Sequence, residues 1–115
     1  MAAREAGVRR IAMSLPESSE APHFDMTSFR VAGKIFATIP PAGDRVHVFL
    51  DQEAVQAYCA EYRGVVEELW WGKKLSGCVV MLRGATQGLL REMLTDAWCR
   101  KAPKSVLAQF EGSET

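Results

Sequence analysis

The chain has 115 residues, the length of one ordinary domain, and its 14 lysine and arginine residues are balanced by 14 aspartate and glutamate residues. Zero net charge excludes a globally basic nucleic-acid binder, and the longest apolar run, residues 78–82, is far short of the ~20 residues that cross a bilayer. Three widely spaced cysteines without a CxxC pair argue against a disulfide framework and a metal site, and they favour a cytoplasmic location.

The first half of the chain predicts one helix followed by strands. Apolar residues at positions 8, 11, 12 and 15 follow helical spacing, and Pro16 ends that helix. Residues 16–23 ("PESSEAPH") are expected to form a polar connector. Residues 27–31 and 34–39 are rich in β-formers and flank Ala32-Gly33, a two-residue turn signal, while residues 45–50 alternate as a third strand. We therefore expect a three-stranded antiparallel meander.

The second half predicts two helices around a further strand. Asp51 is a helix N-cap before an apolar stripe, Gly64 is the expected stop, and residues 65–77 are interpreted as a partly buried loop. Residues 78–82 form a strand, and Thr86 caps a long helix that Pro103 breaks. The layout α-β-β-β-α-β-α predicts an α+β fold, an antiparallel β-sheet with helices packed on it. It forms a single domain over residues 1–115, with its core from about 8 to 110 and a tail at 111–115.

Catalytic constellations are not recognisable in the sequence. Glycine-rich phosphate motifs and the GxSxG elbow are absent, and a Ser-His-Asp triad would need one of only two histidines. His47 alternates with strand core residues, which favours a structural role, whereas His23 is either an acid–base group or a loop-capping residue. The cysteines fall on apolar stripes or a strand and are interpreted as buried filler. We therefore predict no catalytic residues and no cofactor, and a binding protein rather than an enzyme.

The stretch "WWGKK" at residues 70–74 carries the strongest binding signal. Trp70 and Trp71 provide faces on which nucleobases stack, and Lys73 and Lys74 provide charges for phosphates. The alternative is that one or both tryptophans close an edge of the core and the lysines belong to an ordinary solvated loop, because tryptophan is highly buried on average.

Several stretches together resemble the MmcQ/YjbR family, whose members are mostly uncharacterised. They are "SLPESSEAPHF", "SFRVAGKIFATI", "WWGKK" and "LLREMLTDAWCRKAPKSV", and the resemblance runs from about residue 11 to 104. It implies a compact α+β fold and a role in DNA binding through a double wing, in which two β-elements straddle the duplex. One wing would be the hairpin through Arg30, Gly33 and Lys34, and the second would involve residues 70–74 and the strand that follows.

Two main hypotheses follow for the function. In the first, the chain binds DNA through a cationic hairpin and loop, which comprise Arg30, Gly33, Lys34, Arg45, Lys73 and Lys74, with Arg83 as a further phosphate contact. In the second, His23, Trp70 and Trp71 line an apolar recess, rimmed by lysines, for a small anionic ligand or a protein partner. A homodimer formed through exposed aromatic residues is a third candidate, although nothing in the sequence indicates it. A shared face for positions 30, 34, 45, 73 and 74 would favour the first hypothesis.

Overall fold

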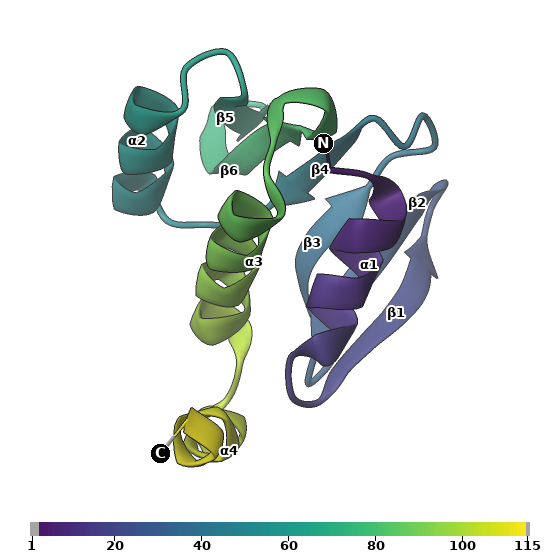
Figure 1. The fold of residues 1–115 in the computed structure, drawn as a ribbon, viewed down its shortest axis with the longest axis vertical. Coiled ribbons are helices and arrows are strands. Elements are labelled where there is room, and N and C mark those ends of the chain that lie inside the picture. Colours follow the sequence, from purple (N-terminus) through teal and green to yellow (C-terminus); the bar gives the residue numbers. More distant parts are fainter. Residues whose placement is uncertain (1–2, 115) are drawn as a thin grey trace.

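Six strands form one antiparallel sheet in the order β1-β2-β3-β4-β6-β5, and helices pack on it (Figure 1). The computed structural model describes residues 3–114, with side chains up to residue 109. The strands are β1 (Ser18–His23), β2 (Met26–Val31), β3 (Lys34–Ile39), β4 (Arg45–Val48), β5 (Val66–Trp71) and β6 (Lys74–Met81). The helices are α1 (Glu5–Ser14), α2 (Gln52–Glu61), the short 3-10 helix η1 (Leu82–Gly84), α3 (Gln87–Lys101) and α4 (Lys104–Glu114). The expected α+β fold is confirmed.

The hairpin between β2 and β3 turns through Ala32 and Gly33, as the sequence predicts. Val31 pairs with Lys34, and both turn residues have positive φ angles, 52° for Ala32 and 80° for Gly33. Positive φ at both central positions is the type I′ arrangement, whose twist matches that of the flanking strands. Ala32 therefore occupies a backbone conformation that alanine rarely adopts. The pairing of β2 with β3 also shifts register between Phe29 and Arg30.

Two segments expected to be irregular are strands, so those predictions are wrong. The predicted connector at 16–23 contains β1, which pairs with β2 as an edge strand; Pro22 is tolerated there because the outer side of an edge strand needs no ladder partner. The predicted loop at 65–77 contains β5 and the first residues of β6, which form a second hairpin through Gly72 and Lys73. A register shift between Leu69 and Trp70 interrupts the period-2 pattern that would have revealed this hairpin.

The core lies between the sheet and helices α1 and α3, which lie side by side on one face of it (Figure 1). The predicted apolar stripe of α3 is fully confirmed, since all of its members are buried: Leu89, Leu90, Met93, Leu94, Ala97 and Trp98. Trp98 also links distant parts of the chain, because its indole Nε1 donates a hydrogen bond to the carbonyl oxygen of Pro16 at 3.0 Å. The predicted N-caps are confirmed as well: Asp51 accepts from the N–H of Ala54, and Thr86 accepts from that of Leu89.

Helix α4 follows Pro103 and is longer than the one or two turns expected. It extends to Glu114, across most of the predicted tail, and Thr115 lies outside the described residues. Figure 1 shows α4 beyond the C-terminal end of α3, with Val106 as its buried residue among those whose side chains are described. None of the described helices is both long enough and apolar enough to cross a membrane.

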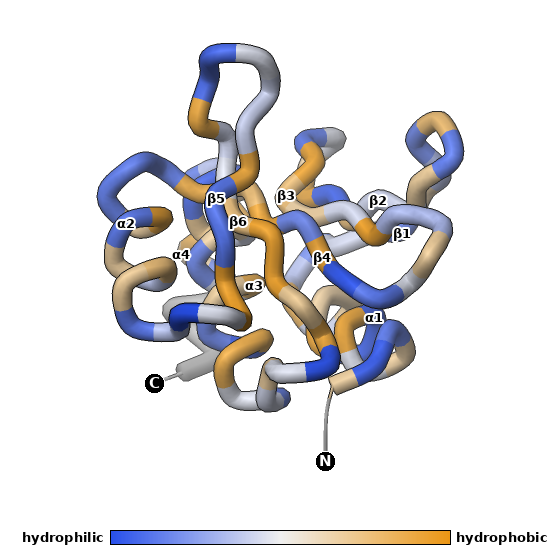
Figure 2. Tube along the Cα trace, turned by 90° about the horizontal axis from the view of Figure 1, so that it is seen from above, coloured by the Kyte–Doolittle hydropathy of each residue, from blue (hydrophilic) through white to orange (hydrophobic). Residues whose placement is uncertain are grey.

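The short strand β4 determines where the sheet opens. Because β4 is antiparallel to both β3 and β6, those two strands run in the same direction, and both begin at the same end of the sheet. β4 stops at Val48, opposite Ala37 and Cys78, so the first residues of β3 and β6 continue without a strand between them. The hairpins that start β3 and β6 therefore flank a gap, and Figure 2 shows the β5–β6 hairpin projecting well beyond the body of the protein.

Candidate ligand-binding recess between two hairpins

A recess of about 520 Å³ occupies the gap beyond the end of β4. The β2–β3 hairpin bounds it on one side, the β5–β6 hairpin on another, and the last turn of α3 on a third. The residues that line this recess, called the inter-hairpin recess below, are His23, Met26, Gly33, Lys34, Ile35, Thr38, Phe49, Trp71, Lys74, Leu75, Ser76, Arg100 and Lys101. Its size is typical of pockets that hold small molecules or single chemical groups of a larger ligand.

Four cationic side chains from three elements meet in this recess, and none of the lining residues is acidic. Lys34 begins β3, Lys74 begins β6, and Arg100 and Lys101 lie in the last turn of α3. Burial lowers the pKa of Lys101 from its ordinary value, and the charges of Arg100, Lys34 and Lys74 lower it further. Within the described residues, no ion pair involves any of these four side chains. The recess therefore holds positive charge that an anionic ligand would neutralise.

Trp71 forms an aromatic wall of the recess. Its ring meets that of Phe49 edge to face, with ring centroids 5.2 Å apart and an interplanar angle of 61°. Phe49 is itself buried and is fixed by its backbone N–H, which donates to the carbonyl oxygen of Phe36 at 3.1 Å. Trp71 nevertheless remains 57% exposed. The arrangement holds the indole in place while leaving much of its surface available for contact.

The recess combines residues from both functional hypotheses. Gly33, Lys34 and Lys74 from the predicted DNA-binding set and His23 and Trp71 from the predicted ligand recess all line it. The His23 ring lies edge to face against Phe24, with ring centroids 4.7 Å apart. Phe24 forms the tip of the β1–β2 hairpin, where it is 89% exposed and has a φ of 57°. The β1–β2 hairpin thus reaches the margin of the recess.

Two residues of the β5–β6 hairpin that the sequence singles out lie outside the lining. Trp70 precedes Trp71, and neighbouring residues of a strand point to opposite faces. It is 50% exposed, and its Nε1 donates to the carboxylate of Glu68 at 3.2 Å. Lys73 is exposed in the hairpin turn and directly precedes Lys74 of the lining.

The arginines of the predicted DNA-binding set, Arg30 and Arg45, are not among the residues that line the recess. The guanidinium of Arg30 donates to Ser28 Oγ at 3.0 Å and to the Pro22 carbonyl oxygen at 3.4 Å, which hold it against β1 and β2. Arg45 pairs with Asp44 through contacts of 3.0 and 3.1 Å.

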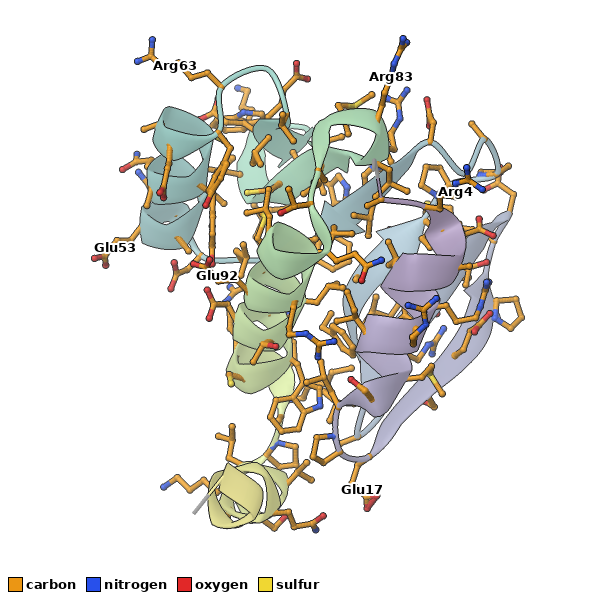
Figure 3. The ribbon with its side chains drawn as sticks, viewed as in Figure 1. Arg4, Glu17, Glu53, Arg63, Arg83 and Glu92 are labelled. Atoms are coloured by element: carbon orange, nitrogen blue, oxygen red, sulfur yellow. The ribbon has the colours of Figure 1, made fainter. Side chains whose placement is uncertain are left out.

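Arg45 also lies far along the sheet from the recess. It stands opposite Met81, and Met81 is seven residues along β6 from Lys74, or roughly 23 Å at the rise of a strand. Arg83 lies in η1, and Figure 3 shows its side chain pointing away from the body. Arg45 and Arg83 are therefore separated from the recess lysines, whereas Arg30 lies opposite Ile35 of the recess lining without being part of that lining.

Arg100, Lys101 and Phe49 are site residues that sequence reasoning missed. The basic residues at 100, 101 and 104 around Pro103 are the sequence signal for this part of the site, but the apolar stripe of the same helix predicts only its packing on the sheet. Cations in the last turn of a helix also complement its dipole, so their type alone does not indicate a site. Only the packing of α3 across the sheet brings them to the two hairpins.

The remaining polar candidates have structural roles. Burial, followed by the charge of Arg45, lowers the pKa of His47, whose Nδ1 lies 3.3 Å from Thr38 Oγ1 on the neighbouring strand. Burial also raises the pKa of the Cys78 thiol to about 12, which favours the protonated form at neutral pH. Among the described residues, no group of histidine, cysteine and acidic side chains is arranged to hold a metal ion.

A cluster between α2 and α3 also has a structural role. The hydroxyl of Tyr58 lies 3.2 Å from the carboxylate of Glu92 and donates to that of Asp96. Figure 3 shows Glu92 at the boundary of the two helices. Burial and both carboxylates raise the pKa of Tyr58, so its hydroxyl remains a donor and fastens α2 to α3.

The six-stranded antiparallel sheet with helices packed on it places the protein in the α+β class, and two of its hairpins border a cationic recess. A family model described as YjbR matches residues 13–100. The chain therefore belongs to the YjbR family, in agreement with the MmcQ/YjbR resemblance of its sequence motifs. The crystal structure of Deinococcus radiodurans protein DR2400, with a DUF419 domain, superposes with a TM-score of 0.72 at 20% identity, covering 85% of this chain and 78% of that one. That likeness supports the fold. No curated protein matches the chain.

Proposed function

We propose that this protein is a nucleic-acid-binding module that holds phosphates at the inter-hairpin recess and performs no chemical step. The observation that carries the proposal is the convergence of Lys34, Lys74, Arg100 and Lys101 on one recess without an acidic neighbour in its lining. Lysine and arginine side chains supply most phosphate contacts of nucleic-acid-binding proteins. The β2–β3 and β5–β6 hairpins correspond to the two wings that the family resemblance implies.

The proposed phosphate-binding surface is confined to the inter-hairpin recess and does not extend over a whole cationic face of the sheet. Arg30 and Arg45 are occupied by partners within the protein, so we leave them out of the binding set. Lys73 at the tip of the β5–β6 hairpin remains as a peripheral contact. A small set of contacts and zero net charge favour weak, salt-sensitive binding with little sequence preference.

Fluorescence anisotropy with labelled oligonucleotides over a salt series tests the proposal. Four phosphate contacts predict that log K falls against log[salt] with a slope of roughly −3 for a single strand and −3.6 for a duplex. The double variant Lys34→Gln/Lys74→Gln should weaken binding and reduce the magnitude of the slope by roughly 1.5. The matched control is Arg63→Gln/Arg83→Gln, because Figure 3 shows both arginines pointing away from the body. No binding at micromolar protein in low salt, or an equal loss in both double variants, would refute the proposal.

A small anionic ligand is the second candidate. The recess is concave, has an aromatic wall, and its volume of about 520 Å³ falls among those of ordinary ligand pockets. Differential scanning fluorimetry against a panel of phosphorylated and carboxylated metabolites tests it. A compound that raises Tm in the parent protein but not in Lys34→Gln/Lys74→Gln, together with flat anisotropy for oligonucleotides, would favour this candidate over nucleic acid.

A further inference from the structure

We propose that the inter-hairpin recess receives one unstacked nucleobase, which makes the protein selective for single-stranded over duplex nucleic acid. The inference rests on the proposed function and specifies the form of the ligand. The base would stack on Trp71, and the flanking phosphates would contact Lys34 and Lys74 on the two hairpins. Three features of the recess support this arrangement.

The first feature is the presentation of Trp71. A tryptophan that only closed the core would be buried, whereas Trp71 is 57% exposed and faces a recess. Phe49 restrains it from the side at 5.2 Å, so little freedom of the indole is lost when a ring stacks on it. Stacking of a base on an aromatic side chain is tolerant of sequence because every base has a π-face.

The second feature is the placement of the cations around this wall. Lys74 pairs directly with Trp71 across the β5–β6 hairpin, so its charge lies beside the indole. Lys34 approaches from the other hairpin, and Arg100 and Lys101 approach from α3. In a strand, each base projects from a sugar that is flanked by two phosphates, and the recess offers an aromatic face with cations on different elements around it. Apolar lining from Ile35 and Leu75 suits a base better than a bare phosphate.

The third feature is the concave shape. In a duplex the faces of the bases are covered by their stacking neighbours, and only their edges are accessible in the grooves. A duplex therefore contacts the hairpin tips, but it does not place a base face on Trp71 unless a nucleotide is flipped out, which costs unstacking and unpairing energy. A single strand enters the recess at a smaller cost, because it has no base pair to break.

Anisotropy with three probes of equal length and label tests the inference: a single strand, the duplex of the same sequence, and an abasic strand with the same phosphates. We expect the single strand to bind at least 10-fold more tightly than the other two. Trp71→Leu should weaken single-strand binding by about 10-fold and leave duplex binding unchanged, whereas Trp71→Phe should retain most of the affinity. Trp70→Leu is the matched control, since Trp70 is similarly exposed but lies outside the recess.

The outcomes separate this inference from the proposed function. Equal affinities for duplex and single strand, or equal effects of Trp71→Leu and Trp70→Leu, would overturn the inference and leave phosphate binding intact if Lys34→Gln/Lys74→Gln still weakens it. Absence of binding by all three probes would overturn both. Circular dichroism and Tm of each variant establish that it is folded, and Trp71→Phe supports the stacking role only if Trp71→Leu loses affinity at unchanged Tm.

Discussion

Gly77 controls how closely β4 approaches β6, and replacing it with alanine should damage both the fold and the recess. A Cβ atom at position 77 would lie 2.1 Å from the carbonyl oxygen of Val48 and 2.9 Å from the Cα atom of Phe49. Both are backbone atoms, which cannot move aside by rotation of a side chain. Accommodation therefore requires the end of β4 to shift by about 1 Å relative to β6, because unstrained carbon–oxygen contacts lie near 3.3 Å.

The expected loss of stability follows from the packing and the hydrogen bond that this shift of β4 disrupts. Overpacking in a well-packed interior costs about 1–3 kcal/mol, and the hydrogen bond from Phe49 N–H to the Phe36 carbonyl oxygen contributes about 1 kcal/mol more. We expect Gly77→Ala to lower the free energy of unfolding by about 3 kcal/mol and Tm by roughly 10–15 °C. Displacement of Phe49 would also release Trp71, so the variant should lose oligonucleotide affinity at temperatures where it is still folded.

Urea denaturation followed by circular dichroism measures the effect, and Gly88→Ala is the matched control. Gly88 is exposed in the first turn of α3, where an added Cβ meets only Thr86 Oγ1 at 3.9 Å, so alanine should stabilise the helix by about 0.5 kcal/mol. The same chemical change is thus expected to have opposite signs at the two positions. A Gly77→Ala protein whose free energy of unfolding lies within about 0.5 kcal/mol of the parent value would refute the close approach of β4 to β6.

Three further predictions concern the hairpin turn, the recess and the sheet. Ala32→Asn should raise the free energy of unfolding by about 0.5 kcal/mol in urea titrations, because asparagine tolerates the positive φ of the type I′ turn better than alanine; a loss would contradict the turn assignment. Lys101→Gln should raise Tm slightly, because it relieves repulsion among the four recess cations, and it should weaken oligonucleotide binding, because it removes one phosphate contact. A fall in both Tm and affinity would argue against repulsion among these cations. Because the pKa of His47 is lowered, the folded state binds a proton at this residue less readily than the unfolded state does. The free energy of unfolding should therefore fall as pH drops from about 7.5 through 6.5 and below. His47→Gln should reduce this pH dependence, as measured by Tm at several pH values.

The elements that the sequence predicts correctly are those whose local signals agree with their packing. The last long helix has a cap at Thr86 and an uninterrupted stripe ending at Trp98, and every stripe residue is buried. The β2–β3 hairpin has strong β-formers on both sides of its glycine. In the helix the burial repeats with the helical period, so the stripe alone is sufficient. In the hairpin the turn signal and the β-forming residues are sufficient, although β3 buries residues 36–39 in succession and does not alternate.

The edge strands β1 and β5 could not be predicted in the same way. β1 has no buried residue, and β5 buries only Val66 and Leu69, so neither alternates between apolar and polar positions. Edge strands are held by ladder hydrogen bonds to a neighbour that lies elsewhere in the sequence, and they are commonly polar to prevent aggregation. Their composition therefore resembles that of a loop, and only pairing with β2 and β6 distinguishes them.

The candidate site follows from topology more than from any motif. Lys34 and Lys74 come together because β3 and β6 run in the same direction on either side of a strand that ends early, a relation that neither hairpin encodes alone.

The equal numbers of acidic and basic residues conceal how the charges are distributed. Arg9 is neutralised by Glu20 at 2.8 Å and Arg45 by Asp44 at 3.0 Å, whereas the four recess cations have no ion-pair partner within the described residues. Like charges crowded together cost free energy in the unliganded protein, and that cost is recovered when an anion binds. A neutral protein can therefore still hold one strongly cationic site, and the convergence of four cations without an acidic residue in the lining identifies the inter-hairpin recess as the place where a phosphate would be bound.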